Sequence, residues 1–179
     1  MTSLIQNAAS FGITYNASSM TLYSNSYLPE NVFVDNDNSY FISADSTANQ
    51  WWQVSFSKPV EISSYIFKTS SGYGRRPKMW CAMASLDGIQ WRIVGVYEKD
   101  IGGNTEKFYP YEPFNCFHFK IILIQNTYND NYLIFTFFDC FGKLGTNQTK
   151  RFMYYCNTLN TQNSLTMQIL FTSLLSLSH

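Results

Sequence analysis

The clearest pattern in the chain is the alternation of apolar and polar residues in QWWQVSFS, residues 50–57. Neighbouring side chains of a strand point to opposite faces of a sheet. Trp52, Val54 and Phe56 can therefore share one buried face, with the polar residues on the other. Trp51 cannot enter the same core and must fill a separate place. This favours a protein of two packed sheets with a capped end.

Further strand-like runs follow, separated by turn residues, and no long stretch has helical periodicity. A second strand is predicted over residues 60–69, after an interruption at Lys58-Pro59. Asp87-Gly88 predicts a two-residue hairpin turn, which needs positive φ at both positions. Strands are also expected over residues 114–125 and 132–141. Short strands with hairpin-type connections predict an antiparallel sandwich or barrel.

The pattern changes after Leu144. Residues 146–162 are polar and rich in Asn and Thr, and residues 165–177 form an uncharged apolar run. This run is too short for a membrane-spanning helix, which needs about 20 residues. Two interpretations stay open, a loosely ordered tail and a short helix that rests on the domain or touches a membrane. We predict one β domain at residues 1–145 and a poorly ordered tail at residues 146–179.

The composition agrees with an all-β domain and limits the partners. The chain is 45% hydrophobic, 18% aromatic and only 13% charged, which is typical of strands rich in Phe, Tyr, Val and Ile. The formal net charge is zero, so no basic field attracts phosphate backbones and nucleic acid is not expected as a partner. The N-terminal residues lack the charged and apolar regions of a signal peptide, so a cytoplasmic location is expected.

The cysteines allow two interpretations. They lie far apart, without a C-x-x-C pair, at Cys81, Cys116, Cys140 and Cys156. The first three stand inside apolar strand-like runs, which favours buried free thiols in a reducing compartment. The alternative is one disulfide in a secreted protein.

Four motifs follow one another in a recognisable order: VDNDNSYF (34–41), WWQVSFSKPVEIS (51–63), RPKMWCAMASLDGIQWRIV (76–94) and FFDCFG (137–142). Through them the chain resembles the discoidin family, the coagulation factor V/VIII C-type domains, from about residue 31 to residue 144. The third motif is the most specific, since it keeps the family spacing of Trp80, Ser85, Asp87, Gly88 and Trp91. The resemblance implies an antiparallel jelly-roll β-sandwich of the galactose-binding-like type. In such a sandwich, Trp51 would brace the turn at residues 35–39.

The resemblance also implies a candidate metal site. Many carbohydrate-binding relatives hold a structural calcium ion at the first turn. The matching oxygen donors here are Asp35, Asp37, Ser39 and, from the last strand, Asp139. Calcium takes 6–8 oxygen ligands, which carboxylates and carbonyls of a turn can supply together. The alternative is an Asx-turn whose carboxylates cap backbone amides.

A ligand surface is expected on three loops at one end of the sandwich, where the family binds: residues 23–29, 72–76 and 127–132. Flat rings for the C–H face of a sugar would come from Tyr27, Tyr73 and Tyr128. Hydrogen bonds to hydroxyls would come from Arg75, Arg76, Asn129 and Asn131. Loops on a rigid sandwich often carry function, although Tyr, Asn and Gly are also ordinary loop residues.

Catalysis is not expected. The histidines are His118, in a predicted strand, and His179, at the end of the tail, and no hydrolase, metalloprotease or P-loop motif is present. We therefore predict a non-catalytic module that binds a glycan or another polar ligand. The alternative is an intracellular domain for protein–protein interaction, of the scaffold or adaptor kind. Membrane contact is not expected except through the tail, because the loops present tyrosines rather than Trp or Leu.

Overall fold

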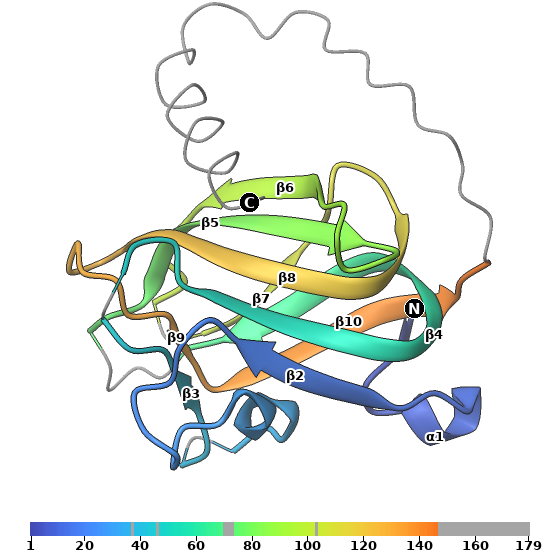
Figure 1. Ribbon diagram of the computed structural model, residues 1–179, viewed down its shortest axis with the longest axis horizontal. Coiled ribbons are helices and arrows are strands. Elements are labelled where there is room, and N and C mark those ends of the chain that lie inside the picture. The colour runs from blue at the N-terminus through green and yellow to red at the C-terminus, as the bar shows by residue number, and fades with distance from the viewer. Residues whose placement is uncertain (37, 46, 70–73, 103, 147–179) are drawn as a thin grey trace, which may run out of the picture. The chain divides into compact units, whose positions relative to one another are not determined.

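The computed structural model describes residues 1–36, 38–45, 47–69, 74–102 and 104–146. The tail predicted at residues 146–179 lies outside these residues except for Thr146, and the domain boundary at residue 145 stays a prediction. The described chain is built mainly from antiparallel strands (Figure 1). They are β1 (Thr2–Ser3), β2 (Tyr15–Ser19), β3 (Phe41–Ile42), β4 (Trp51–Lys68), β5 (Pro77–Ser85), β6 (Arg92–Glu98), β7 (Thr105–Phe108), β8 (Phe114–Asn126), β9 (Ile134–Phe135) and β10 (Phe137–Leu144). Two short helical segments precede β3, namely α1 (Ala8–Phe11) and the 3₁₀ segment η1 (Pro29–Phe33).

One long strand, β4, belongs to both layers of the sandwich. Its first half pairs with β8 and β2, its residues 60–62 pair with both β8 and β10, and its last residues pair with β10 and β7. The strand order is β1-β10-β4-β8-β5-β6, with β3 and β9 as a separate pair. Figure 1 shows β4 bending so that β10 comes to lie behind the layer of β8, β5 and β6. The antiparallel β-sandwich predicted from the sequence is confirmed.

The core between the layers contains the residues that the alternation predicted. Trp52 and Val54 are fully buried and Phe56 nearly so. The Trp52 ring lies 4.6 Å from that of Phe138 in the other layer, and its Nε1 donates a hydrogen bond of 3.0 Å to the Pro29 carbonyl. Burying a large apolar side chain contributes about 1.5–3 kcal/mol to stability. These rings hold the two layers together.

Two predicted interruptions differ in the structure. β4 continues through Lys58-Pro59, and its register against β8 shifts between Ser55 and Val60 instead. A bulge of this kind accommodates a proline within a strand. The predicted two-residue turn is also wrong, because the connection between β5 and β6 runs from residue 86 to residue 91. Gly88 has a positive φ of 75°, whereas the φ of Asp87 is not positive.

The side chain of Asp87 explains this longer turn. Its carboxylate accepts hydrogen bonds from the amides of Ile89 (2.8 Å) and Gln90 (2.7 Å) and from the Ser85 hydroxyl. These backbone hydrogen bonds lower the pKa of Asp87. Side-chain capping therefore shapes the turn, where the sequence predicted a backbone turn of the hairpin type.

Trp51 also lies elsewhere than expected. It stands opposite Ile122 on the face of the sheet that points away from the core, and its ring centroid is 4.5 Å from the Lys120 ammonium. The prediction that it braces the turn at residues 35–39 is therefore wrong. Trp52, bound to Pro29 in η1, supports the chain just before that turn.

The described cysteines are buried thiols. Cys81, Cys116 and Cys140 are free, while Cys156 lies outside the described residues. Burial raises the pKa of Cys81 to about 12 and also raises the pKa of Cys116 and of Cys140. Within the described ranges, no helix is long and apolar enough to cross a membrane.

Candidate functional site

Two of the three predicted loops are joined by hydrogen bonds. The Thr127 amide donates to the Arg76 carbonyl (3.0 Å), and the Arg76 amide donates to Thr127 Oγ1 (3.1 Å). Thr127 Oγ1 in turn donates to the Gly74 carbonyl. The loop that precedes β5 and the loop that follows β8 therefore form one continuous surface.

A buried amide, that of Asn126, fixes the second of these loops. Asn126 is fully buried at the end of β8, and its Oδ1 accepts the amides of Tyr128 (3.0 Å) and Asp130 (3.2 Å). Its Nδ2 donates to the Tyr132 carbonyl (3.1 Å) and to the Asp130 carboxylate. Asn129 takes a left-handed conformation with φ of 58° inside this turn. The loop is thus held in one conformation from within.

Arg75 is the cation of this surface. Its Nε donates to the Asp130 carboxylate, and its guanidinium carbon lies 5.5 Å and 5.0 Å from the ring centroids of Tyr128 and Tyr132. The hydrogen bond to Asp130 raises the pKa of Arg75. Burial alone would raise the pKa of Asp130, but hydrogen bonds from Asn126 and Arg75 lower it overall. The two side chains form an ion pair that presents both donors and acceptors.

Tyrosine rings extend the surface away from Arg75. Tyr23 lies 6.0 Å from Tyr132 and 5.8 Å from Tyr27, and Tyr27 stacks on Tyr40 at 4.8 Å between ring centroids. Among the rings of this cluster, the most exposed are those of Tyr128 (64%) and Tyr23 (58%). We call this set the tyrosine surface: Tyr23, Tyr27, Tyr40, Tyr128, Tyr132 and Arg75.

The tyrosine surface contains some of the predicted ligand residues and omits others. Tyr27, Arg75 and Tyr128 come together, whereas Tyr73 lies outside the described residues. Arg76 instead forms two hydrogen bonds with the Asp100 carboxylate (2.9 Å and 3.0 Å), and these lower the pKa of Asp100 to about 2.

The two predicted asparagines contact neighbouring segments of the chain. Asn129 Oδ1 accepts from Gln125 (2.6 Å), and the Asn131 amide donates to the Asp45 carboxylate (2.7 Å). Whether either one binds a ligand stays a prediction. The sequence did not single out Tyr23, Tyr40, Tyr132 or Asn126, although Tyr23 begins one of the predicted loops and Tyr132 ends another.

The described members of the predicted calcium site have protein partners. Asp35 Oδ1 pairs with Lys68 Nζ at 3.0 Å, and Ser39 Oγ donates to the Asn31 carbonyl (3.1 Å). Asp139, only 3% exposed, accepts from Ser3 Oγ (3.0 Å) and from the Cys140 amide (2.7 Å), and burial raises its pKa. Asp37 is not among the described residues.

The described residues therefore do not fit a calcium site by themselves. They contain no group of three or more His, Cys, Asp or Glu side chains that could hold a metal ion. The turn has instead an Asx hydrogen bond, from the Asn38 amide to Asn36 Oδ1 (3.0 Å). The alternative interpretation expected an Asx contact here, although it assigned the capping to carboxylates and the observed cap is the amide oxygen of Asn36.

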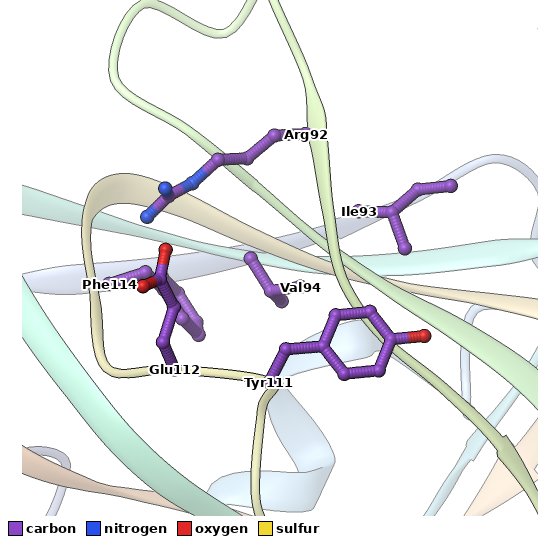
Figure 2. A pocket seen from close by; sticks show the side chains of 6 residues that line it. All are labelled: Arg92, Ile93, Val94, Tyr111, Glu112 and Phe114. Carbon is purple, nitrogen blue, oxygen red and sulfur yellow. The ribbon is translucent and has the colours of Figure 1, made fainter. Parts of the chain in front are cut away.

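A shallow hollow of about 230 Å³ lies apart from the tyrosine surface and shares no residue with it. Figure 2 shows it at β6 and the loop before β8, with the charged ends of Arg92 and Glu112 pointing toward one another. Its lining residues are Arg92, Ile93, Val94, Tyr111, Glu112 and Phe114. The hollow is small for a ligand pocket. We therefore place the candidate site on the tyrosine surface, where exposed flat rings stand beside fixed polar groups.

Comparison with known proteins agrees with the fold. The family description "F5/8 type C domain" matches residues 14–137. A family 32 carbohydrate-binding module from NanJ of Clostridium perfringens, solved in complex with galactose, is 16% identical, with a TM-score of 0.65 over 78% of this chain and 97% of that chain. Module CBM32-5 of CpGH89 from the same organism, solved with GalNAc-β-1,3-galactose, is 14% identical, with a TM-score of 0.65 over 79% and 100%.

A third similar structure comes from an animal. The fucolectin of striped bass (Morone saxatilis) serum is 16% identical, with a TM-score of 0.61 over 72% of this chain and 46% of that chain. No curated protein sequence matches the chain. At these identities the solved structures establish the shared fold.

Proposed function

Because this chain belongs to the F5/8 type C domain family, a family of non-catalytic binding modules, we propose that it binds a glycan through the tyrosine surface. The observation that carries the proposal is the exposed Tyr128 ring beside the Arg75–Asp130 ion pair. The glycan complexes of the similar modules support the choice of ligand class.

The chemistry of a sugar suits this arrangement. The C–H face of a pyranose ring packs on a flat aromatic ring, and Tyr128 and Tyr23 are exposed enough to supply one. Sugar hydroxyls both donate and accept hydrogen bonds, and Arg75 and Asp130 offer one group of each kind. Both groups are already held in place, so little ordering cost falls on binding.

The same ion pair favours a neutral sugar over an acidic one. An anionic ligand would have to compete with Asp130 for the Arg75 guanidinium and would lie close to the Asp130 carboxylate. A neutral ligand can hydrogen-bond to both members of the pair without separating them. We therefore expect neutral galactose-type or related sugars rather than uronic or sialic acids.

A glycan array tests the proposal. We expect saturable binding by the full chain, weakened about tenfold, or about 1.4 kcal/mol, by Tyr128→Ala. Tyr109→Ala is the matched control, because Tyr109 is similarly exposed (59%) but lies outside the tyrosine surface. A blank array, or equal loss from both substitutions, would contradict the proposal.

The second candidate function is that of an intracellular protein-interaction domain. The buried free thiols Cys81, Cys116 and Cys140 support it, because secreted domains more often pair their cysteines. The array separates the two functions. A blank array together with a stable protein partner that co-purifies from the source would favour the interaction domain.

A structural calcium ion at Asp35, Asp37, Ser39 and Asp139 stays a separate proposal. The resemblance of the turn supports it, whereas the Asp35–Lys68 ion pair weighs against it. Calcium titration against Tm decides the question. A calcium-dependent rise in Tm that Asp35→Ala removes would support the site, and the same response in both proteins would end it.

A further inference from the structure

The sheet of β8, β5 and β6 is apolar on the face that points away from the core. An antiparallel sheet with one face on the core normally has polar side chains on the other. On β5, however, Trp80, Ala82 and Ala84 enter the core. The side chains that alternate with them on the outer face are Met79, Cys81 and Met83. β5 is thus apolar on both faces, as is typical of a strand covered on both sides.

The register carries this apolar face onto the neighbouring strands. Cys81 stands between Val96 of β6 and Ile122 of β8, and Met83 stands opposite Ile93. We call this set the outer apolar face: Met79, Cys81, Met83, Ile93, Val96 and Ile122. Cys81 (0% exposed) and Ile122 (5%) are buried within it, and the other four side chains are partly exposed.

Apart from Trp51 at the start of β4, the apolar character ends at the next strands. On the same side of the sheet, β2 and β4 pair Ser18 with Gln53 and Asn16 with Ser55. Polar residues thus occupy the part of this face where contact with water costs little free energy. The apolar part is therefore a local feature of β8, β5 and β6 and not of the whole sheet.

One cation, Lys120, lies inside this apolar region. It stands opposite Met83, and its Nζ lies 3.8 Å from the ring centroid of Trp91 and 4.5 Å from that of Trp51. Burial lowers the pKa of Lys120 to about 8. No ion pair among the described residues includes it.

A half-buried ammonium without a carboxylate is costly, and contact with two indole rings offsets only part of that cost. The nearby polar side chains do not offset the remaining cost of burying the Lys120 ammonium. His118 is engaged with Ser55 Oγ at 2.8 Å, and the Asp87 carboxylate is engaged with its own turn. The region therefore combines apolar side chains with one ammonium group, that of Lys120, that a carboxylate would stabilise.

We propose that the outer apolar face, with Lys120, Trp51 and Trp91, is a docking surface for a protein segment that presents apolar side chains around one Asp or Glu. The carboxylate of the segment pairs with Lys120 between the two indoles, and its apolar side chains cover Met83 and its neighbours. Trp is enriched among the residues that contribute most to protein interfaces, and a close charge pair at such a place adds specificity and can add affinity. This surface is distinct from the tyrosine surface and does not depend on the proposed glycan binding.

The probe is a display library of random linear peptides, selected on the full chain and, separately, on Lys120→Glu. We expect wild type to enrich apolar peptides that contain one Asp or Glu, and Lys120→Glu to weaken them at least about tenfold. Exchanging the peptide carboxylate for Lys should restore binding to Lys120→Glu. Lys58→Glu, an equal charge change at an exposed position of β4, and Tyr128→Ala should both bind as wild type does.

A second measurement needs no variant. The pKa of Lys120, followed by NMR in wild type, should rise when a selected peptide binds, because a carboxylate then stabilises the ammonium. Three results would overturn the proposal: enrichment without acidic residues, an unchanged pKa of Lys120 in the complex, or a dimer of wild type that Met83→Asp dissolves. The last result would assign the face to a second copy of the chain.

Discussion

At the scale of single residues, one buried amide organises the candidate site. Asn126 contacts four groups of the loop that follows it, and these include the amides of Tyr128 and Asp130. A buried polar group with all its partners is worth far more than an exposed one, because removing it leaves those partners unsatisfied. The position of Tyr128 on the surface therefore depends on a side chain that no ligand would touch.

We expect Asn126→Ala to lower the free energy of unfolding by about 2–3 kcal/mol, since several loop groups lose their partner. Glycan affinity should fall with it. Urea unfolding measures the loss of stability, and a glycan-binding titration measures the loss of affinity. Faster hydrogen exchange of the Tyr128 amide would show that the loop itself has loosened. Asn129→Gly, which keeps the left-handed backbone, is the control and should change stability little. A loss below about 0.5 kcal/mol for Asn126→Ala would refute this role.

Asp139 makes stability depend on pH. Burial raises its pKa above the ordinary value, so the native state holds this proton more tightly than the unfolded state does. Its contribution is therefore most favourable below the ordinary carboxyl pKa and is lost as the pH rises through the raised value. Asp139→Asn keeps an acceptor for Ser3 and removes the charge. We expect the variant to gain stability over wild type between pH 3 and pH 7, as measured by urea unfolding; a variant that is less stable at pH 7 would contradict this.

At the scale of elements, close backbone contacts shape the strands as much as side chains do. β10 shifts register against β4 between Phe141 and Gly142. A Cβ atom at Gly142 would lie 1.7 Å from the Glu61 carbonyl oxygen, where no atom can fit. The glycine that ends the fourth sequence motif is thus required by the approach of two strands.

Gly142→Ala should therefore lower the free energy of unfolding by about 3 kcal/mol or more, at the upper end of overpacking effects. The nearest obstacle is backbone, which cannot move aside as a side chain can. Gly102→Asn is a suitable comparison, because Asn tolerates the left-handed φ of 59° and the nearest atom there is 3.6 Å away. Chemical denaturation should show a change of well under 1 kcal/mol for that control, and similar losses in both variants would disprove the explanation.

At the scale of the whole domain, β8 connects the two surfaces described above. Lys120 lies within β8 and Asn126 ends it, so six residues, or about 20 Å of strand, separate the apolar face from the base of the tyrosine surface. Sites this far apart on a rigid strand usually act independently. One domain can therefore hold a glycan at its loop end and a protein segment on its sheet.

The sequence predicted whatever depends on local periodicity and little that depends on distant contacts. The alternation in residues 50–57 identified the buried face of β4, because burial follows strand geometry. It could not show that Asp35 meets Lys68, or that Tyr23 meets Tyr132, since only folding brings such residues together. The turn after Ser85 was misjudged because the Asp87 side chain, rather than the backbone dihedrals of two residues, determines its shape.

The bent strand β4 has a mechanical consequence. Since one continuous strand is hydrogen-bonded into both layers, neither layer can unfold without breaking the hydrogen bonds of the other. Cys81 in one half and Cys140 in the other are natural reporters of this, once Cys156 is replaced by Ser. Both thiols should become reactive toward an alkylating reagent at the same urea concentration, as in a single all-or-none transition.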